Sequence, residues 1–230
     1  MDDGLLKPSK LPPERQAQLR ARFDALAGQI PPALQRYPGY APRLQLEFRS
    51  GLGANAFALP GGQVVMTDGL VQAAAKQGLD DDALVGVLAH EIGHVVHRHT
   101  TRMVVEQGVL QMGLGLALGD VSGVLSTGGA LLTGLHYRRN HEREADCFAI
   151  DLMRHAALPT APMGTLLLAI AHDEDDAEGS QKSGASQPAP QKQGKAEAAH
   201  PIWSLLSSHP DTVERAHALQ QGQSPHCSAP

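Results

Sequence analysis

The sequence predicts a mostly helical α+β domain with a small antiparallel sheet beside one strongly amphipathic helix. Short segments that alternate apolar and polar residues occur only in the first third of the chain. A Pro-Gly-Gly turn separates two of these segments, and from residue 68 onward apolar residues recur at helical spacing. The 230 residues contain no internal repeat, and we expect them to form a single domain over residues 1–230.

The first third of the chain predicts one helix and three strands. Residues 14–27 carry apolar side chains at helical spacing after a Pro-Pro pair, which suits a first helical turn. Residues 44–49 alternate between apolar and polar and predict a half-buried strand. Residues 55–59 and 63–67 flank the Pro-Gly-Gly turn, so we expect them to form a β-hairpin.

Helices account for most of the remaining chain. A short helix is expected at residues 68–76. Asp80, Asp81 and Asp82 open the clearest helix, which continues to about residue 102, because carboxylates cap free N–H groups and favour the positive end of the helix dipole. Further helices are expected at residues 104–118, 121–135, 139–155 and 160–172, with a last one ending near residue 220.

Residues 173–199 differ in composition from the rest of the chain. This segment contains almost no large apolar residue and is rich in Ser, Gln, Lys, Gly and Ala. Such a composition cannot bury enough apolar surface to become ordered. The segment therefore predicts a flexible low-complexity insertion, with a lid over the site as the alternative.

Composition and charge exclude several classes of protein. Nineteen basic residues face 24 acidic ones and no basic stripe is visible, so nucleic acid is not expected as a partner. The N-terminus lacks the basic and apolar regions of a secretory signal. Residues 109–135 contain an Asp and many small polar residues, which favours two packed helices over a membrane span. Cys147 is expected to be a small buried residue, and Cys227 lies in a polar tail.

The sequence H-E-I-G-H at residues 90–94 predicts a metal site. On a helix, His90 and His94 share one face, so both imidazoles can reach one ion. Glu91 would lie beside the ion, where it can accept a proton from the attacking water and pass it to the leaving amine. The alternative is a helix with two solvated histidines, but the flanking residues here are strongly apolar.

A catalytic zinc needs a third protein ligand and an open fourth position. A histidine soon after the motif can supply it in some peptidases, but Thr100 stands where that histidine would be. Glu142 and Asp146 are four residues apart on a later predicted helix, and Glu144 points away from their common face. Glu142 can therefore bind the metal while Asp146 hydrogen-bonds a ligand imidazole. The alternative is a charged surface helix.

Three motifs now follow one another along the chain. They are H-E-x-x-H at 90–94, Y-x-R-x-x-E-x-E-A-D at 137–146 and S-x-H-P-x-x-x-x-R at 207–215. In this order they resemble the HtpX-like zinc peptidases, which are gluzincins and also include the CAAX prenyl proteases and quality-control peptidases of mitochondria and bacterial envelopes. Residues 55–67 match that family's strand before the active-site helix, so the resemblance covers roughly residues 44–219.

The resemblance implies a complete set of site residues. His90, His94 and Glu142 would hold Zn2+, Glu91 would be the catalytic base, and Asp146 would support a ligand imidazole. The fold would then be a gluzincin-like metallopeptidase domain, and the enzyme a zinc endopeptidase.

The same resemblance implies roles for one strand and one further histidine. The strand containing Asn55, Ala56, Phe57 and Ala58 would bind an extended protein or peptide substrate by β-augmentation. His209 would be a removable fourth ligand that switches the enzyme off. Two other interpretations of His209 stay open, namely a hydrogen-bond donor to the transition state and a structural histidine before proline.

The family also suggests substrates and a location. The expected substrates are unfolded or misassembled proteins. Because most relatives carry membrane helices, we expect the soluble domain of a membrane-anchored protein of the bacterial cell envelope, with any membrane association through a segment outside this chain. Two other functions stay open: a non-proteolytic zinc-binding chaperone or adaptor with an occluded site, and a metal-free interaction module in which the motif is accidental.

Overall fold

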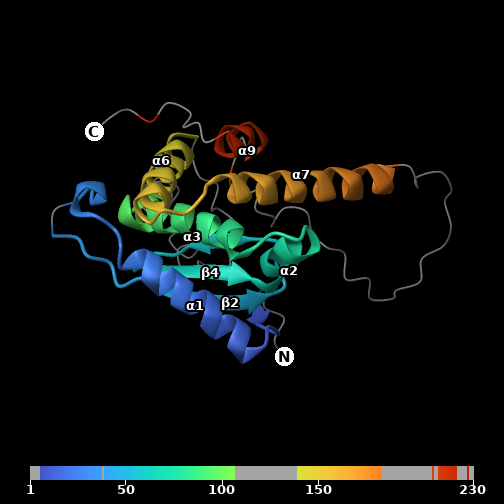
Figure 1. The fold of residues 1–230 in the computed structure, drawn as a ribbon, viewed down its shortest axis with the longest axis horizontal. Helices are drawn as coiled ribbons and strands as arrows, with labels where there is room; N and C mark the ends of the chain where they lie inside the picture. The colour runs from blue at the N-terminus through green and yellow to red at the C-terminus, as the bar shows by residue number, and fades with distance from the viewer. Residues whose placement is uncertain are drawn as a thin grey trace, which may run out of the picture.

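The computed structural model describes residues 6–37, 39–106, 139–182, 209, 212–221 and 227. Its elements form a small sheet covered by helices, with the longest helix running along the outside of the molecule (Figure 1). The helices expected at 121–135 and over most of 104–118 lie outside the described residues, as does the possible span at 109–135. Within the described ranges, no helix combines the length and apolar character needed to cross a bilayer.

The sheet is mixed, and the expectation of a purely antiparallel sheet is wrong. Its strand order is β1 (Lys7–Pro8), β2 (Gln45–Ser50), β4 (Gln63–Thr67) and β3 (Ala56–Ala58). β3 and β4 form the expected antiparallel hairpin, whereas β2 and β4 are parallel. The middle of β4, Val64 to Met66, is apolar and buried on both faces, so this strand takes a central position and leaves β3 at the edge.

Side chains alternate between the two faces of this sheet. Leu46, Phe48 and Val64 belong to the main core on one face, which α1 (Pro13–Ala27) and α3 (Asp81–Val96) also line. Phe57 and Val65 point to the other face, where they form a second cluster with Met103 and Leu52.

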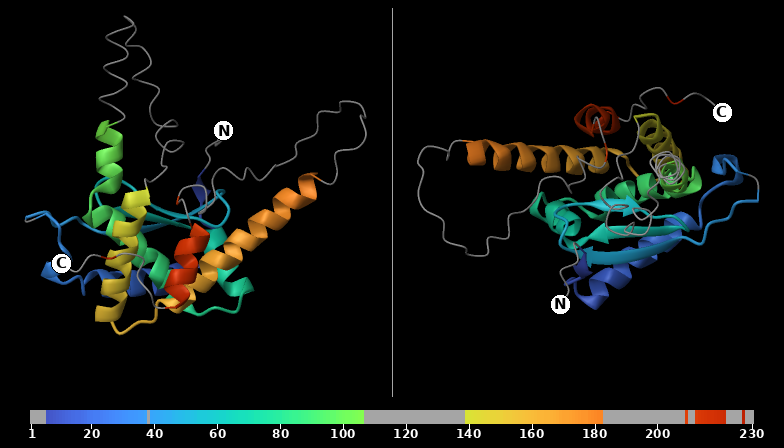
Figure 2. Two further views of the ribbon diagram at one scale, coloured as in Figure 1. Left: turned by 90° about the horizontal axis from the view of Figure 1, so that it is seen from above. Right: turned by 180° about the vertical axis from the view of Figure 1, so that it is seen from behind.

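Three of the later helices lie on the far side of α3 from the sheet, whereas α1 also packs on the sheet. α2 (Asp68–Lys76) follows β4 directly, and α6 (Arg139–His155), α7 (Ala161–Lys182) and α9 (Thr212–Gln220) form the outer layer (Figures 1 and 2). A short 3-10 turn at Pro32–Leu34 follows α1. α3 is thus packed between the sheet and this outer layer, and all of its residues from Ala83 to Val96 are buried.

α3 begins as expected but ends early. Asp80 caps it, since its side chain accepts a hydrogen bond from the Asp82 backbone N–H at 3.1 Å. The expected helix to residue 102 is interrupted after Val96, because Arg98 has φ of 57°, in the left-handed region. Residues 99–106 are helical again, and this break sets the direction of the side chains that follow it.

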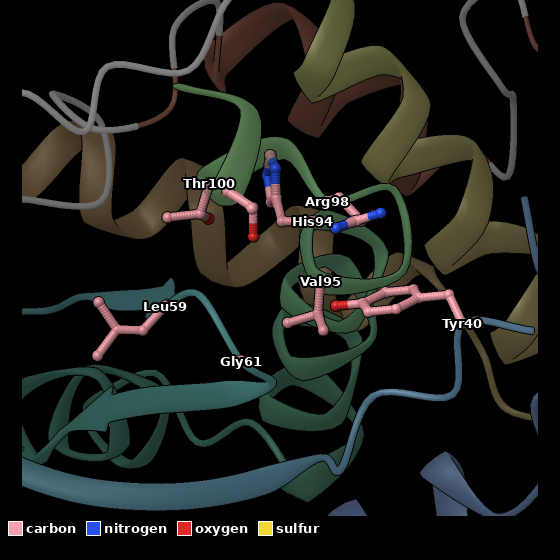
Figure 3. A pocket seen from close by; sticks show the side chains of 8 residues that line it. Tyr40, Leu59, Gly61, His94, Val95, Arg98 and Thr100 are labelled. Carbon is pink, nitrogen blue, oxygen red and sulfur yellow. The ribbon is translucent and has the colours of Figure 1, made fainter. Parts of the chain in front are cut away.

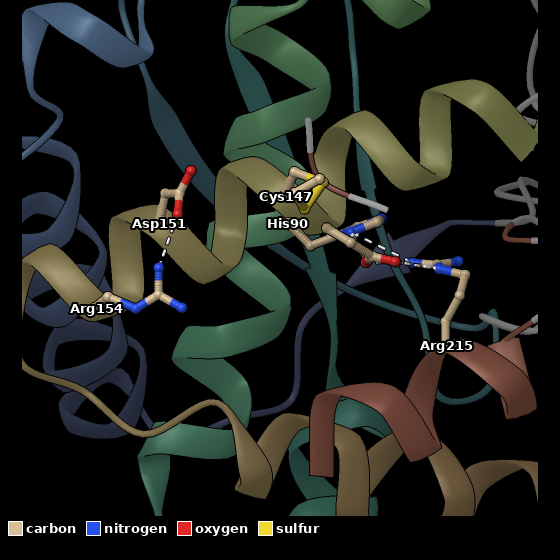
Figure 4. Close-up of a disulfide and its surroundings, with 7 residues drawn as sticks. His90, Cys147, Asp151, Arg154 and Arg215 are labelled. Carbon is tan, nitrogen blue, oxygen red and sulfur yellow. Dashed lines mark hydrogen bonds and ion pairs between the residues drawn. A yellow bond between two sulfur atoms is a disulfide. The ribbon is translucent and has the colours of Figure 1, made fainter. Parts of the chain in front are cut away.

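The C-terminal part of the chain differs from expectation in two places. α7 continues past residue 172 to Lys182, into the range expected to be an insertion. Residues 183–199 lie outside the described residues, so the flexible insertion stays a prediction. Cys147 and Cys227 form a disulfide with Cα atoms 5.5 Å apart (Figure 4). This bond shows that the expectation of Cys147 as simply a small buried residue is wrong. The two cysteines are 80 residues apart, and the sequence gives no sign that they pair.

Gly93 allows α3 and α6 to approach closely. A methyl group at its Cα would lie 3.1 Å from both Cα and the carbonyl oxygen of Ala145, and 3.2 Å from Cβ of Phe148. These contacts are tighter than ordinary van der Waals separation, and two of them are to backbone atoms that cannot rotate away. The room beside Gly93 is therefore taken by α6.

We expect Gly93→Ala to lower the free energy of unfolding by about 1–3 kcal/mol, because the added methyl group must push α6 away from α3. Urea unfolding of the purified protein measures the change. Gly28→Ala is the matched control, since a methyl group there meets its nearest atom at 3.4 Å and the backbone has φ of −67°. Equal stability of Gly93→Ala and wild type would show that α6 is not held this closely.

Candidate metal centre

Three elements bring the expected site residues together in the interior. α3 supplies His90 and His94, which lie on successive turns, and Glu91, which follows His90; all three are buried. α6 supplies Glu142 and Asp146 from the face that packs on α3. His209, three residues before α9, completes the cluster and is 2% exposed.

Four of these side chains offer donor atoms around one point. His90, His94, Glu142 and His209 each place one ligand atom within 4.8 Å of the others. His90 Nε2 lies 2.9 Å from His94 Nε2 and 3.5 Å from Glu142 Oε2, and His94 Nε2 lies 3.3 Å from Glu142 Oε1. A tetrahedral zinc with bonds of about 2.0–2.1 Å keeps its ligand atoms about 3.3 Å apart, so these spacings match one ion.

His209 takes the fourth corner of this arrangement. Its Nδ1 lies 3.3 Å from His90 Nε2 and 3.0 Å from Glu142 Oε2. Its Nε2 faces the other way and lies 3.5 Å from Glu91 Oε1. The imidazole therefore stands between the common point of the donors and the carboxylate expected to be the base.

Glu91 is a buried carboxylate with few partners. Its side chain is 0% exposed, and among the described residues neither oxygen accepts a hydrogen bond. Burial raises the pKa of Glu91, with the neighbouring His209 and His90 opposing that change. A carboxylate left in this state is costly for folding, and such groups are typical of sites where a ligand or reactant completes the contacts.

Arg215 on α9 binds both carboxylates of α6. Its Nε and Nη2 donate to the two oxygens of Asp146 at 2.6 and 2.7 Å, and its Nη1 donates to Glu142. Asp146 Oδ1 also lies 2.9 Å from His90 Nδ1, so it orients that ring with Nε2 toward the common point. Burial alone would raise the pKa of Asp146, but Arg215 and His90 outweigh it and lower that pKa.

The charges of the cluster favour a bound cation. Among the described residues, Glu91, Glu142 and Asp146 are buried around one guanidinium, that of Arg215, so carboxyl groups outnumber the permanently charged cation. Burial would lower the pKa of His90, but contacts with Asp146 and Glu142 raise it to about 9. These carboxylates thus attract positive charge to the point where the donors meet. Nitrogen and oxygen donors around a buried, negatively charged point fit Zn2+.

A second chain of contacts leads away from His94. Its Nδ1 lies 2.9 Å from His99 Nδ1, and His99 Nε2 lies 3.0 Å from Glu144 Oε2. Arg36 Nη1 lies 2.8 Å from the same oxygen. Burial lowers the pKa of His99 to about 2. Burial would raise the pKa of Glu144, but hydrogen bonds from Arg36 and His99 lower it to about 2.

A small pocket lies beside His94 and the end of β3 (Figure 3). The Arg98 guanidinium stacks over the Tyr40 ring at 4.8 Å on one side of it, and Thr100 Oγ1 donates to the Ala58 carbonyl at 3.0 Å on the other. The lining residues are Tyr40, Leu59, Gly61, His94, Val95, Arg98, Thr100 and Thr101.

The strand expected to bind substrate lies at the edge of the sheet. β3 contains Ala56, Phe57 and Ala58, and Asn55 precedes it with its backbone N–H bonded to Thr67 Oγ1 at 2.8 Å. Phe57 faces Val65 of β4, so the backbone groups of Ala56 and Ala58 point away from that neighbour. The side chains of β3 are buried, which leaves backbone atoms as its only means of contact along this edge.

Two residues of this cluster were given no role in the sequence analysis. Arg215 ends the third motif, but only the fold shows that it binds both carboxylates. His99 lies five residues after His94, beyond the helix break, so no helical spacing connects the two. Glu144 does point away from the face of Glu142, as expected, yet it contacts the site through His99.

Comparison with known proteins gives a consistent family. The profile described as peptidase family M48 matches residues 13–223. The mitochondrial metalloendopeptidase OMA1 of Saccharomyces cerevisiae is 34% identical over 105 residues, which are 44% of this chain and 29% of that protein. The Schizosaccharomyces pombe protein of the same name is 34% identical over 118 residues, 49% of this chain and 33% of that protein.

A bacterial protein is similar over a comparable stretch. A Vibrio cholerae protein, described by its name as a beta-barrel assembly-enhancing protease, is 30% identical over 122 residues. These are 47% of this chain and 24% of that protein. The matches thus span only a quarter to a third of the length of these three relatives.

We expect Arg215→Met to lower the free energy of unfolding by about 3–5 kcal/mol, because it leaves Glu142 and Asp146 buried without their cation. Urea unfolding in the presence of a chelator measures the change. Arg154→Met is the control, since Arg154 and Asp151 form an exposed pair at 3.1 Å (Figure 4) and should contribute less than about 1 kcal/mol. Similar losses in both variants would contradict the role given to Arg215.

Proposed function

Because this chain belongs to peptidase family M48, we propose that it is a zinc-dependent endopeptidase that cleaves unfolded or misassembled proteins. The observation that carries the proposal is the meeting of His90, His94 and Glu142 from two helices around one buried point. An accidental H-E-x-x-H motif would not be expected to meet a carboxylate from a distant segment. That meeting therefore argues against the metal-free interaction module.

In this proposal His90, His94 and Glu142 hold Zn2+. Bound zinc supplies Lewis acidity, which polarises the scissile carbonyl and makes water acidic enough to react near neutral pH. Burial lowers the pKa of His94 well below its usual value, which favours the neutral ring that a metal ligand requires. His90, whose pKa Asp146 and Glu142 raise to about 9, would release a proton on binding the metal. Asp146 and Arg215 keep His90 and Glu142 in position.

Glu91 is proposed as the general base and acid. It follows His90 on α3, so its carboxylate lies beside the point where the ligand atoms meet. Burial raises its pKa, which makes the carboxylate a stronger base than an exposed Glu. It would accept a proton from the attacking water and pass that proton to the nitrogen of the departing amine.

The substrate is proposed to bind along β3 as an added strand. Ala56 directs its backbone groups away from β4, and so does Ala58, whose carbonyl accepts a hydrogen bond from Thr100 that a substrate strand would have to displace. Backbone pairing recognises an extended chain with little regard to its sequence. Such recognition suits unfolded proteins, which present extended segments. The pocket beside His94 and Leu59 lies next to the end of this strand.

The cell envelope is proposed as the location. The Vibrio cholerae relative is named for beta-barrel assembly, and the two yeast relatives are named as mitochondrial enzymes. The disulfide between Cys147 and Cys227 supports an oxidising compartment such as the periplasm.

His209 is proposed to hold the enzyme in an inactive state. Catalytic zinc sites keep one position open for water, whereas His209 Nδ1 already stands at the fourth corner. Its Nε2 also faces Glu91, so the same ring lies where the attacking water would have to be. Activity would then require His209 to move, and its release would open both positions together.

The same closed arrangement favours one alternative function. Four protein ligands are typical of structural zinc sites, so the chain could be a non-proteolytic zinc-binding chaperone or adaptor. Glu91 argues for the peptidase, because a structural site gains nothing from a buried carboxylate that accepts no hydrogen bond among the described residues.

We expect Glu91→Gln to lower the rate of casein cleavage by about 10²–10⁴-fold, because the amide cannot accept the proton of water. Zinc content should stay at that of wild type, since Glu91 is not a proposed ligand. Glu14→Gln, on the exposed side of α1, serves as the control and should cleave normally. Cleavage that persists in Glu91→Gln, or that ignores both chelator and added zinc, would reject the mechanism.

We expect His209→Ala to raise the rate of casein cleavage roughly fivefold or more, because without the imidazole a larger fraction of the molecules is in the open, active state. The double variant with Glu91→Gln should be inactive, which excludes a contaminating protease. A fall in activity would identify His209 as a transition-state donor, and an unchanged rate would leave it a structural residue.

A further inference from the structure

His99 is buried at the centre of a chain of polar contacts that starts at His94. Its side chain is 0% exposed, and its two ring nitrogens contact different partners. Nδ1 lies 2.9 Å from His94 Nδ1, and Nε2 lies 3.0 Å from Glu144 Oε2. Arg36 Nη1 lies 2.8 Å from that carboxylate oxygen and is the last member of this series of contacts, nearest the surface.

The direction of each hydrogen bond in this series of contacts follows from the direction of the first one, between His94 and His99. If His94 binds metal through Nε2, its remaining proton is on Nδ1 and must be donated. His99 Nδ1 is then an acceptor, which leaves the His99 proton on Nε2. That proton can only be donated to Glu144, an acceptor that Arg36 in turn holds in place.

We propose that His99 is a positioning residue that fixes the tautomer and ring orientation of His94, with Glu144 and Arg36 fixing His99 in the same way. The inference rests on the proposed zinc site. It makes the two histidine ligands depend on different supports: His90 on the buried Asp146, and His94 on a second imidazole backed by a carboxylate nearer the surface.

Two features of the fold hold His99 in this role. The left-handed residue Arg98 ends α3 and starts a new helical segment at residue 99, so His99 can face back toward α3. The ring of His141, from α6, stacks on that of His99 with centroids 4.3 Å apart and planes 11° apart. The stacked ring restricts rotation of His99 about its side-chain bonds.

The same residues could be mistaken for a second metal site. His97, His99 and Glu144 also place ligand atoms within 4.8 Å of one another. However, the Arg36 guanidinium already supplies a positive charge to Glu144 Oε2, and His97 Nδ1 is 3.8 Å from that oxygen. The positive charge of Arg36 disfavours a metal cation beside it. These residues are therefore better explained as a series of hydrogen bonds than as a second metal site.

Zinc affinity, measured by competition with a chromophoric chelator, tests the proposal without relying on activity. We expect His99→Phe to weaken Zn2+ binding about 10–100-fold, since a ring of similar size remains but His94 loses its acceptor. His99→Asn should recover most of the affinity, because its amide oxygen can take the place of Nδ1. His97→Asn is the matched control and should bind zinc like wild type.

Two further measurements separate positioning from folding. Visible absorption of the Co2+-substituted protein reports ligand geometry and should change in His99→Phe but not in His97→Asn. Circular dichroism of the metal-free variants checks the fold, and Glu144→Ala replaces His99→Phe if the latter does not fold, with a smaller loss of affinity expected.

The outcomes distinguish this inference from the proposed function. Zinc affinity in His99→Phe within twofold of wild type, or in Glu144→Ala if that variant must replace it, would overturn the positioning role while leaving the zinc site intact. A wild-type protein that binds no zinc would overturn the zinc site and this inference together.

Discussion

α3 and α6 meet at Gly93, where the absence of a side chain lets the Ala145 backbone come within 3.1 Å of the position a methyl group would take. This contact determines the distance between the imidazoles of one helix and the carboxylate of the other. His94 and Glu142 then lie 3.3 Å apart across the interface, close enough to share one ion. The apolar residues around Gly93 thus set the metal geometry as much as the ligands themselves.

The second constraint is the charge that this contact buries. Glu91, Glu142 and Asp146 all lie in the interior, and among the described residues only Arg215 brings a fixed positive charge to them. Arg215 is carried by α9, and the disulfide ties the chain beyond α9 to Cys147, the residue next to Asp146. The C-terminal segment therefore neutralises part of the site, and in the proposed inactive state it would also close the site through His209.

The helices and the main ligands could be expected from the sequence, because local periodicity and short motifs carry that information. α2 and α6 begin and end where apolar spacing indicates, and the i, i+4 pairs place His90 with His94 and Glu142 with Asp146. The parallel pairing of β2 with β4 could not be expected, since strand order depends on which strand is buried on both faces. Nor could the partners of Arg215, His99 and Cys147, which are set by contacts between distant segments.

The central claim is that one zinc ion lies between α3 and α6. A crystal structure of the zinc-loaded protein, with anomalous data collected at the zinc edge, tests it most directly. The account predicts one strong anomalous peak within about 2.0–2.2 Å of His90 Nε2, His94 Nε2 and a Glu142 oxygen. A peak elsewhere, or one bound by the histidines with Glu142 out of reach, would contradict it.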